Sequence, residues 1–252
     1  MSTLRNSYNF LKHSPKKPIR NIPKIMHFIF EPFRYASIPD EWKLNIEKFR
    51  TLNPDYVVMI HTLSDSESLL SESYPELYVT YCGLRDTISK IDYTKYIMLY
   101  HYGGLYADLD ITWFRSLRDL VIGGWNMILC KEKDYAIRNQ INNCFMACKK
   151  KSDFILRLLR DCEQTNHLDI VERVLHTTGP VFLTKTFHKS YPKLTELSYL
   201  SNTTTKPLLS NNILILPTLF TSNIEKKDQD PRFLIFHHNY DSSWTPSSKP
   251  YS

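Results

Sequence analysis

The sequence DYTKYIMLYHYGGLYADLDI, from Asp92 to Ile111, joins a helical pattern to a short extended one. Apolar and aromatic residues continue at helical spacing as far as Tyr102. The next two residues, Gly103 and Gly104, end that helix, because glycine readily takes the left-handed conformation that helix C-termini commonly need. We therefore predict a helix that stops at this glycine pair and a strand over Leu105–Ile111.

Two aspartates lie near the end of this predicted strand. Successive side chains of a strand point to opposite faces, so Asp108 and Asp110 are expected to point the same way and Leu109 into the core. Two carboxylates on one face can hold a divalent cation through oxygen ligands. Burying two like charges close together is costly unless a positive charge neutralises them. The pair therefore indicates a cation site.

A second D-x-D triplet occurs at residues 228–230 and serves as an internal comparison. About one such triplet is expected by chance in a chain of this length. This one follows two lysines and precedes a proline, without apolar flanks or a glycine turn, so it predicts an exposed loop. The signal at Asp108 and Asp110 therefore depends on the helix, the glycine pair and the apolar residues that lead into it.

The composition restricts the class of protein. The 252 residues are 42% hydrophobic and 13% aromatic, which is typical of a globular chain with a substantial core. The net charge of +6 suits a phosphate-bearing substrate or an anionic surface. The dense basic patch and fold motif of a nucleic-acid binder are missing. Five cysteines without a C-x-x-C motif indicate reduced thiols and no zinc knuckle.

The N-terminal region and the hydropathy give expectations about organisation and location. Residues 1–21 are polar and basic and are expected to form a tail or a surface arm, while residues 22–252 form one domain. No run approaches the roughly 18 apolar residues that a membrane helix needs, and no apolar core of a signal peptide is present. We therefore expect a soluble cytoplasmic protein, with association to a membrane surface left open.

The rest of the chain alternates strand and helix patterns, which predicts an α/β domain. The strand–helix–strand order over 22–61 favours a parallel βαβ unit. The polar segment 199–212 is expected to be a loop. The expected strands are Ile22–Phe30, Tyr56–His61, Leu105–Ile111, Trp125–Cys130, Asn142–Cys148, Ile213–Pro217 and Arg232–His238.

Other sequence patterns give no competing site. The glycine-rich motifs of dinucleotide-binding proteins and P-loop NTPases are missing, as are G-x-S-x-G and H-E-x-x-H. Isolated histidines such as His27 and His61 are expected to be hydrogen-bonded structural residues. Asp92 and Lys95 are three apart on one helix face, which predicts a surface ion pair worth less than about 1 kcal/mol.

The joined motif over Lys90–Ile111 resembles the sugar-binding region of the DxD-containing glycosyltransferases of family 32. That group includes initiating α-1,6-mannosyltransferases, inositol-phosphoceramide mannosyltransferases and, more distantly, the clostridial glucosylating toxins. Its pattern, D-x-x-R-Y and then Y-G-G-x-Y-x-D-x-D, appears here as Asp92…Lys95-Tyr96 followed by YGGLYADLD. Weaker matches are the opening strand Ile22–Phe30, the turn Asn53–Tyr56, Asn143, the turn Thr178–Pro180 and the closing segment His238–Trp244.

The resemblance implies a single GT-A-like (Rossmann-like) domain with a mixed, mostly parallel sheet flanked by helices. It implies a retaining, DxD-type hexosyltransferase that uses Mn²⁺ or Mg²⁺ to move a sugar from a UDP- or GDP-sugar to a glycan, glycolipid or protein hydroxyl. Asp108 and Asp110 would then be the catalytic pair, and both would bind the metal together with His238. The nucleotide-sugar would contact Phe30, which would stack on the base, and Asp92, Lys95, Asp108, Asn143, Ser242 and Trp244.

Two residues depart from the family pattern. Lys95 replaces an arginine, so a bidentate guanidinium becomes a point charge, while Phe30 replaces a tryptophan and keeps an aromatic face. The lysine leaves open a second interpretation, a non-catalytic nucleotide-sugar- or glycan-binding module of the same fold. A third is another metal-dependent enzyme, a nucleotidyltransferase or phosphohydrolase, which would release pyrophosphate or phosphate instead of a nucleoside diphosphate.

Overall fold

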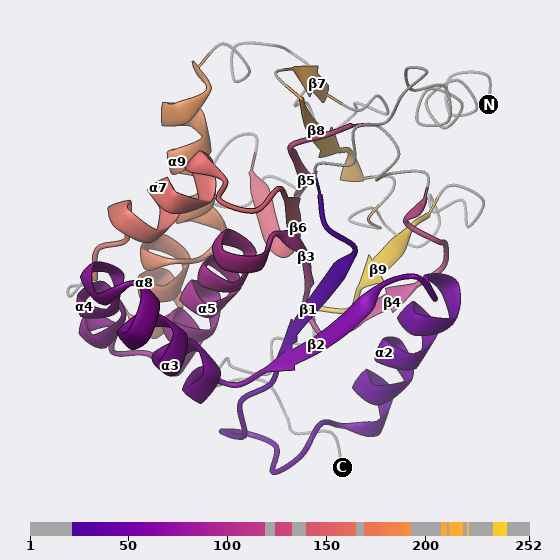
Figure 1. Ribbon diagram of the computed structural model, residues 1–252, viewed down its shortest axis with the longest axis horizontal. Coiled ribbons are helices and arrows are strands. Elements are labelled where there is room, and N and C mark those ends of the chain that lie inside the picture. Colours follow the sequence, from indigo (N-terminus) through magenta and orange to yellow (C-terminus); the bar gives the residue numbers. More distant parts are fainter. Residues whose placement is uncertain are drawn as a thin grey trace.

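A mixed sheet of seven strands runs through the middle of the computed structural model (Figure 1). The structure describes residues 22–118, 124–132, 140–164, 169–192, 208–210, 212–218, 221 and 234–240, so the basic segment 1–21 lies outside it. Along the sheet the order is β2 (Val57–His61), β1 (Ile25–Ile29), β3 (Gly104–Ala107), β6 (Ile141–Cys148), β5 (Met127–Lys131), β8 (Ile213–Leu216) and β7 (Leu208–Ser210).

The pairing directions confirm the predicted sheet type. β1 pairs in parallel with β2 and with β3, and β5 pairs in parallel with β8. β6 runs antiparallel to both of its neighbours, and β7 runs antiparallel to β8. Five of these seven strands therefore point the same way, and the sheet is mixed and mostly parallel.

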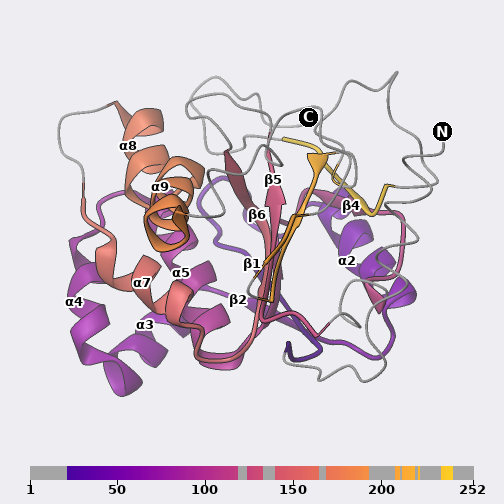
Figure 2. The same ribbon diagram turned by 90° about the horizontal axis from the view of Figure 1, so that it is seen from above.

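Helices cover both faces of this sheet (Figure 2). On one face lie α3 (Leu63–Ser73), α4 (Pro75–Gly83), α5 (Thr87–Tyr102), α7 (Asp153–Asp161), α8 (Ile170–Thr177) and α9 (Pro180–Ser190). On the other face lie α2 (Asp40–Leu52) and a two-stranded sheet of β4 (Ile111–Trp113) and β9 (Phe236–His238). Separate clusters of buried apolar side chains fill the two interfaces, so the sheet is the shared wall between two cores.

The glycine pair after α5 brings β3 directly beside β1. Gly103 has φ 67° and Gly104 has φ 100°, values that side chains with a Cβ adopt at a cost. A Cβ on Gly103 would come within 2.5 Å of the Lys150 backbone nitrogen, and one on Gly104 within 2.6 Å of the Ile25 carbonyl oxygen. The predicted glycine stop is confirmed, and close backbone packing is a second reason for it.

The strand predicted over Leu105–Ile111 is wrong in its second half. β3 ends at Ala107, the Asp108 N–H still donates to the Cys144 carbonyl of β6 at 2.8 Å, and the chain then turns. The Ile111 N–H donates to the Asp108 carbonyl at 3.3 Å, which closes the turn. The two aspartates therefore belong to a turn between two sheets, and strand alternation is not what aligns them.

Two further elements differ from the predictions. Of the expected strand Arg232–His238, the described part begins at residue 234, and within it the strand β9 covers only Phe236–His238 and pairs with β4 in the small sheet. The segment expected to be a loop, 199–212, contains β7 at the edge of the main sheet. Among the residues that the structure describes, no helix is both long and apolar enough to cross a bilayer.

His27 and His61 are structural, as predicted. Their ring nitrogens lie 2.8 Å apart, and the second ring nitrogen of His27 is 2.9 Å from the Gly103 carbonyl oxygen. Burial lowers the pKa of His27 to about 4, so this side chain is neutral in the folded protein at neutral pH. The pair fastens β1 to β2 and to the end of α5.

Candidate active site

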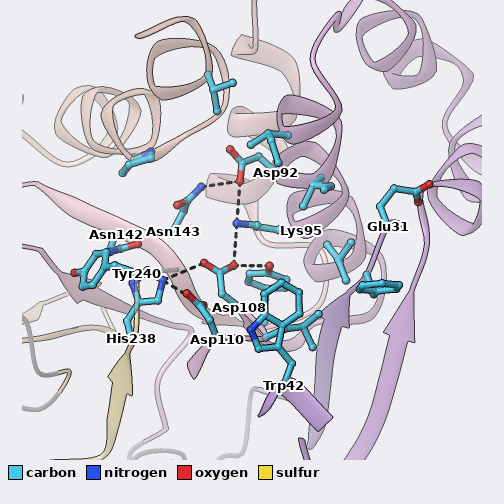
Figure 3. Close-up of a pocket in the computed structure, with 18 of the residues that line it drawn as sticks. Glu31, Trp42, Asp92, Lys95, Asp108, Asp110, Asn142, Asn143, His238 and Tyr240 are labelled. Atoms are coloured by element: carbon cyan, nitrogen blue, oxygen red, sulfur yellow. Dashed lines mark hydrogen bonds and ion pairs between the residues drawn. The ribbon is translucent and has the colours of Figure 1, made fainter. Parts of the chain in front are cut away.

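A cavity of about 260 Å³ opens at the carboxyl ends of β1 and β3. Its floor is polar and is formed by the turn after β3, the buried face of α5, the end of β5, the start of β6 and the segment around β9 (Figure 3). One wall is aromatic and follows β1 into α2. Ligands commonly bind at the carboxyl ends of strands in α/β sheets, and this cavity contains most of the predicted site residues.

Asp108, Asp110 and His238 converge on the floor (Figure 3). The Nε2 atom of His238 lies 3.6 Å from Asp108 Oδ2 and 3.4 Å from Asp110 Oδ1. One ligand atom from each residue falls within 4.8 Å of the others. The pairing of β4 with β9 produces this meeting, because Ile111 faces His238 in the register and Asn239 Nδ2 donates to the Asp110 carbonyl at 2.7 Å.

This trio fits a divalent cation. The two carboxylates supply the oxygen ligands that suit Mn²⁺ and Mg²⁺, and the imidazole adds one nitrogen ligand. Burial and the neighbouring carboxylate of Asp110 raise the pKa of Asp108, against the opposing effect of Lys95. Burial would lower the pKa of His238, but the carboxylates of Asp110 and Asp108 raise it above its ordinary value. A cation bound between the two carboxylates would offset their mutual repulsion, which contributes to the raised pKa of Asp108.

Lys95 links this trio to Asp92. Its ammonium lies 2.8 Å from Asp92 Oδ1 and 3.1 Å from Asp108 Oδ1, with only 5% of Lys95 and 4% of Asp92 exposed. The predicted surface ion pair is therefore wrong. The spacing of three residues was right, but α5 lies between the sheet and other helices, so this face is buried. Burial would lower the pKa of Lys95, yet the two carboxylates raise it well above its ordinary value, so the ammonium stays charged.

Asp92 is held by three donors. Besides Lys95, Asn143 Nδ2 donates to Oδ1 at 3.0 Å and Thr178 Oγ1 donates to Oδ2 at 3.1 Å. Asp108 also accepts a hydrogen bond of 2.6 Å from the Tyr106 hydroxyl. The predicted residues Asp92, Lys95 and Asn143 are thus brought together as one hydrogen-bonded set. Their contact with a nucleotide-sugar stays a prediction.

The aromatic wall begins at Phe30. This residue follows β1, lines the cavity and packs partly buried against the core under α2. Phe33, Tyr35 and Trp42 continue the wall, and the rings of Tyr35 and Trp42 meet edge to face at 5.4 Å. Phe30 is therefore placed where an aromatic ring could be reached from the cavity, and its stacking role stays a prediction. Two other predicted site residues, Ser242 and Trp244, lie outside the described residues.

Glu132 and Tyr240 are among the cavity residues that were not predicted from the sequence. Glu132, 5% exposed, follows β5, and Tyr240 packs its ring 4.1 Å from that of His238. Glu132 belongs to the charged run KEKD, which looks like a solvated loop in the sequence. Tyr240 follows His238 by two residues and occupies a variable position of the closing segment His238–Trp244. Neither position carries a local signal, because their meeting depends on the tertiary fold.

Comparison with known proteins identifies similar sequences that include the two aspartates of this site. Residues 39–134 match the family model described as a glycosyltransferase sugar-binding region containing a DXD motif. A mannosyl phosphorylinositol ceramide synthase of Saccharomyces cerevisiae is 28% identical over 172 residues, which are 68% of this chain and 42% of that protein. An inositol phosphoceramide mannosyltransferase of Schizosaccharomyces pombe is 28% identical over 165 residues, or 64% and 44% of the two chains. The chain therefore spans less than half the length of these relatives.

A solved structure shows the same fold. The PaToxG glycosyltransferase superposes with a TM-score of 0.51 and 20% identity over 77% of this chain and 78% of that one. This likeness supports the predicted GT-A type of fold. Within it, the described trio of Asp108, Asp110 and His238 lies at the floor of the cavity. Over residues 39–134, which include Asp108 and Asp110, this chain is therefore similar to the DXD-containing sugar-binding region of glycosyltransferases.

Proposed function

We propose that this protein is a metal-dependent, retaining glycosyltransferase that moves a hexose from a nucleotide-sugar to an acceptor hydroxyl. The observation that carries the proposal is the convergence of Asp108, Asp110 and His238 on the floor of one cavity. The two aspartates belong to the matched sugar-binding region, and His238 joins them from outside it. We take Asp110 and His238 as metal ligands and Asp108 as a ligand that also contacts the donor. Mn²⁺ is the first ion to test, because the set contains an imidazole nitrogen beside two carboxylates.

The chain's own residues bind and orient the donor. The fixed carboxylate of Asp92 accepts hydrogen bonds from ribose or sugar hydroxyls, while the Lys95 ammonium adds positive charge beside Asp108. Phe30 and the aromatic wall offer a surface for the nucleobase. A divalent cation held by Asp108, Asp110 and His238 would supply positive charge to stabilise the diphosphate leaving group. The cavity thus separates a base-binding wall from a charged floor.

We propose that the configuration at the transferred carbon is retained by front-face attack. At the cavity floor, Asp92 accepts from three donors and Asp108 and Asp110 are assigned to the ion. These carboxylates are therefore poorly placed to form a covalent intermediate. Instead, the bond between the anomeric carbon and the diphosphate breaks, the acceptor hydroxyl oxygen bonds to the oxocarbenium-like carbon on the same face, and its proton passes to the departing diphosphate oxygen. Mass spectrometry of the protein incubated with donor alone should show no glycosyl adduct. A stable adduct on a cavity carboxylate would contradict this route.

The names of the relatives guide the choice of substrates. Two relatives are named as enzymes of inositol phosphoceramide mannosylation, so mannose is the first sugar to test and a glycolipid headgroup the first acceptor. Glycan and protein hydroxyls are the other acceptors to include. For the donor, both UDP- and GDP-linked sugars belong in the panel.

An assay of donor breakdown tests the proposed activity. The purified chain is incubated with each UDP- and GDP-hexose, with Mn²⁺ or with a chelator, and the released nucleotide is identified. We expect a nucleoside diphosphate from one donor, only with Mn²⁺. Release of pyrophosphate or phosphate would instead indicate a nucleotidyltransferase or a phosphohydrolase. Metal-dependent binding of a donor without turnover would indicate a binding module.

A further inference from the structure

Glu132 is a buried carboxylate in the cavity to which the proposed function assigns no role. It lies just after β5 and is 5% exposed. Its Oε2 accepts a hydrogen bond of 2.7 Å from Gln140 Nε2, and its backbone N–H donates to the Gln140 carbonyl at 2.9 Å. Glu132 is therefore fixed to the start of β6. Burying a carboxylate lowers stability unless other interactions compensate. Glu132 is therefore a candidate for a function in this cavity.

Tyr240 lies between Glu132 and His238 in this cavity. Burial raises the pKa of the Glu132 carboxyl, and hydrogen bonding from the Gln140 amide and the Tyr240 hydroxyl opposes that rise. The tyrosine ring packs on His238 with centroids 4.1 Å apart (Figure 3). Tyr240 also has φ 54°, a conformation that a non-glycine residue keeps only where its surroundings hold it. Its ring thus bridges Glu132 and His238.

The backbone of His238 is fixed by β9, but its side chain needs a separate restraint. Residues of β9 pair with β4, and Asn239 is bonded to the Asp110 carbonyl. Among the described residues, the Nδ1 atom of His238 is buried without a hydrogen-bond partner. A metal-binding histidine usually has its other ring nitrogen fixed by a hydrogen bond. Here the ring is restrained by its contact with the Tyr240 ring, which is tilted by 45° to it.

We propose that Glu132 is a positioning residue for metal binding, which acts through Tyr240 to hold the His238 imidazole against Asp108 and Asp110. This inference rests on the proposed metal site. Outer-shell residues of this kind typically change metal affinity by about 10–100-fold. The carboxylate has a second effect in the same direction, because its negative charge near His238 favours a cation.

Calorimetric titration with Mn²⁺ tests this proposal in the full chain. Glu132→Gln keeps the size of the side chain and removes its charge, and Tyr240→Phe removes only the hydroxyl. We expect each variant to bind Mn²⁺ about tenfold more weakly than the wild type. Because the two residues act through one contact, the double variant should lose little more than either single variant.

Glu172→Gln is the matched control. Glu172 lies 3.4 Å from His176 on α8, away from the cavity, so the same substitution beside a histidine should leave Mn²⁺ affinity unchanged. Melting temperatures measured in a chelator check that each variant folds, and Tyr240→Phe keeps the test decisive if Glu132→Gln is unstable.

The outcomes separate this inference from the proposed function. Failure of the wild type to bind Mn²⁺ would remove the metal site itself. Wild-type binding together with unchanged affinity in both Glu132→Gln and Tyr240→Phe would overturn the positioning role alone. Losses that simply multiply in the double variant would also overturn it, since they would show that Glu132 and Tyr240 act independently.

Discussion

Lys95 places its ammonium between two carboxylates, 2.8 Å from Asp92 and 3.1 Å from Asp108. It therefore compensates charge on the buried face of α5 and also helps to orient an aspartate of the D-x-D motif. The family arginine would offer a fork of donors at this place, whereas the lysine offers one charge that both carboxylates share. At the scale of single residues, Lys95 therefore contributes both to the stability of the fold and to the arrangement of the proposed metal-binding residue Asp108.

Removing the Lys95 ammonium should lower the free energy of unfolding. Lys95→Met leaves the carboxylates of Asp92 and Asp108 without their cation, and breaking a buried ion pair from one side costs about 3–5 kcal/mol. We expect the free energy of unfolding in urea, measured with a chelator present, to fall by about 3 kcal/mol. Lys95→Arg, which keeps the charge, should lose less.

Lys43→Met provides the comparison. Lys43 pairs with Asp40 at 2.8 Å on the exposed side of α2, where an ion pair contributes little. Its free energy of unfolding should stay close to that of the wild type. Equal decreases in the free energy of unfolding for Lys95→Met and Lys43→Met would contradict the claim that the Lys95 ammonium stabilises the carboxylates of Asp92 and Asp108.

Sequence reasoning found these charged residues but misjudged some of their surroundings. The spacing of Asp92 and Lys95 predicted contact correctly, yet spacing on one helix cannot tell which face the sheet will cover. Glu132 was missed for a similar reason, because a charged run reads as a surface loop until the fold buries one of its members. Burial of a polar residue is a tertiary property, and local patterns report it poorly.

The turn from α5 into β3 is the element that delivers the aspartates to the cavity. At Gly103 the chain has φ 67°, and a Cβ would meet the Lys150 backbone nitrogen at 2.5 Å. We predict that Gly103→Ala lowers the free energy of unfolding by about 1–3 kcal/mol, through strain and displaced backbone. Chemical denaturation followed by circular dichroism measures this loss.

Gly83 offers a matched substitution. It is the last residue of α4 and has no atom within 4 Å of an added Cβ. Gly83→Ala should therefore leave stability unchanged or raise it slightly, because alanine restricts the unfolded chain. A Gly103→Ala variant as stable as Gly83→Ala would contradict the close packing described at this turn.

Elements with a local signal were predicted well, and those set by distant pairing were not. The helix, the glycine stop and the start of β3 follow from a few adjacent residues. The break at Asp108 does not, because it depends on β4 leaving the main sheet to pair with β9. That pairing joins Ile111 to His238, residues far apart in the chain. The aspartates were thus correctly expected to share a direction, but for a reason that the fold does not use.

At the scale of the whole molecule, the sheet has one core on each face and the cavity at the carboxyl ends of its strands β1 and β3. The His27–His61 contact lies inside this framework and gives it a pH dependence. Burial lowers the pKa of His27 to about 4, from an ordinary value of 6.5, and burial also lowers the pKa of His61. The unfolded chain therefore binds more protons than the folded one between these values.

Stability should accordingly fall on acidification. The contribution of His27 is fully present above pH 6.5 and is lost as the pH falls towards 4. The total loss is on the order of 3 kcal/mol. Urea unfolding at a series of pH values measures this slope, which should be shallower in His27→Gln. Identical slopes in the wild type and His27→Gln would show that His27 is not the titrating group.

The central claim is that Asp108, Asp110 and His238 hold a divalent cation that in turn holds a nucleotide-sugar. Thermal unfolding with a panel of UDP- and GDP-sugars, each with Mn²⁺ or with a chelator, tests it most directly. We predict that one donor raises the melting temperature only when Mn²⁺ is present, since a ligand stabilises the state that binds it. Asp110→Asn should abolish this rise, while Asp230→Asn, in the other D-x-D triplet, should keep it. No rise with any donor, or the same rise in chelator, would contradict the claim.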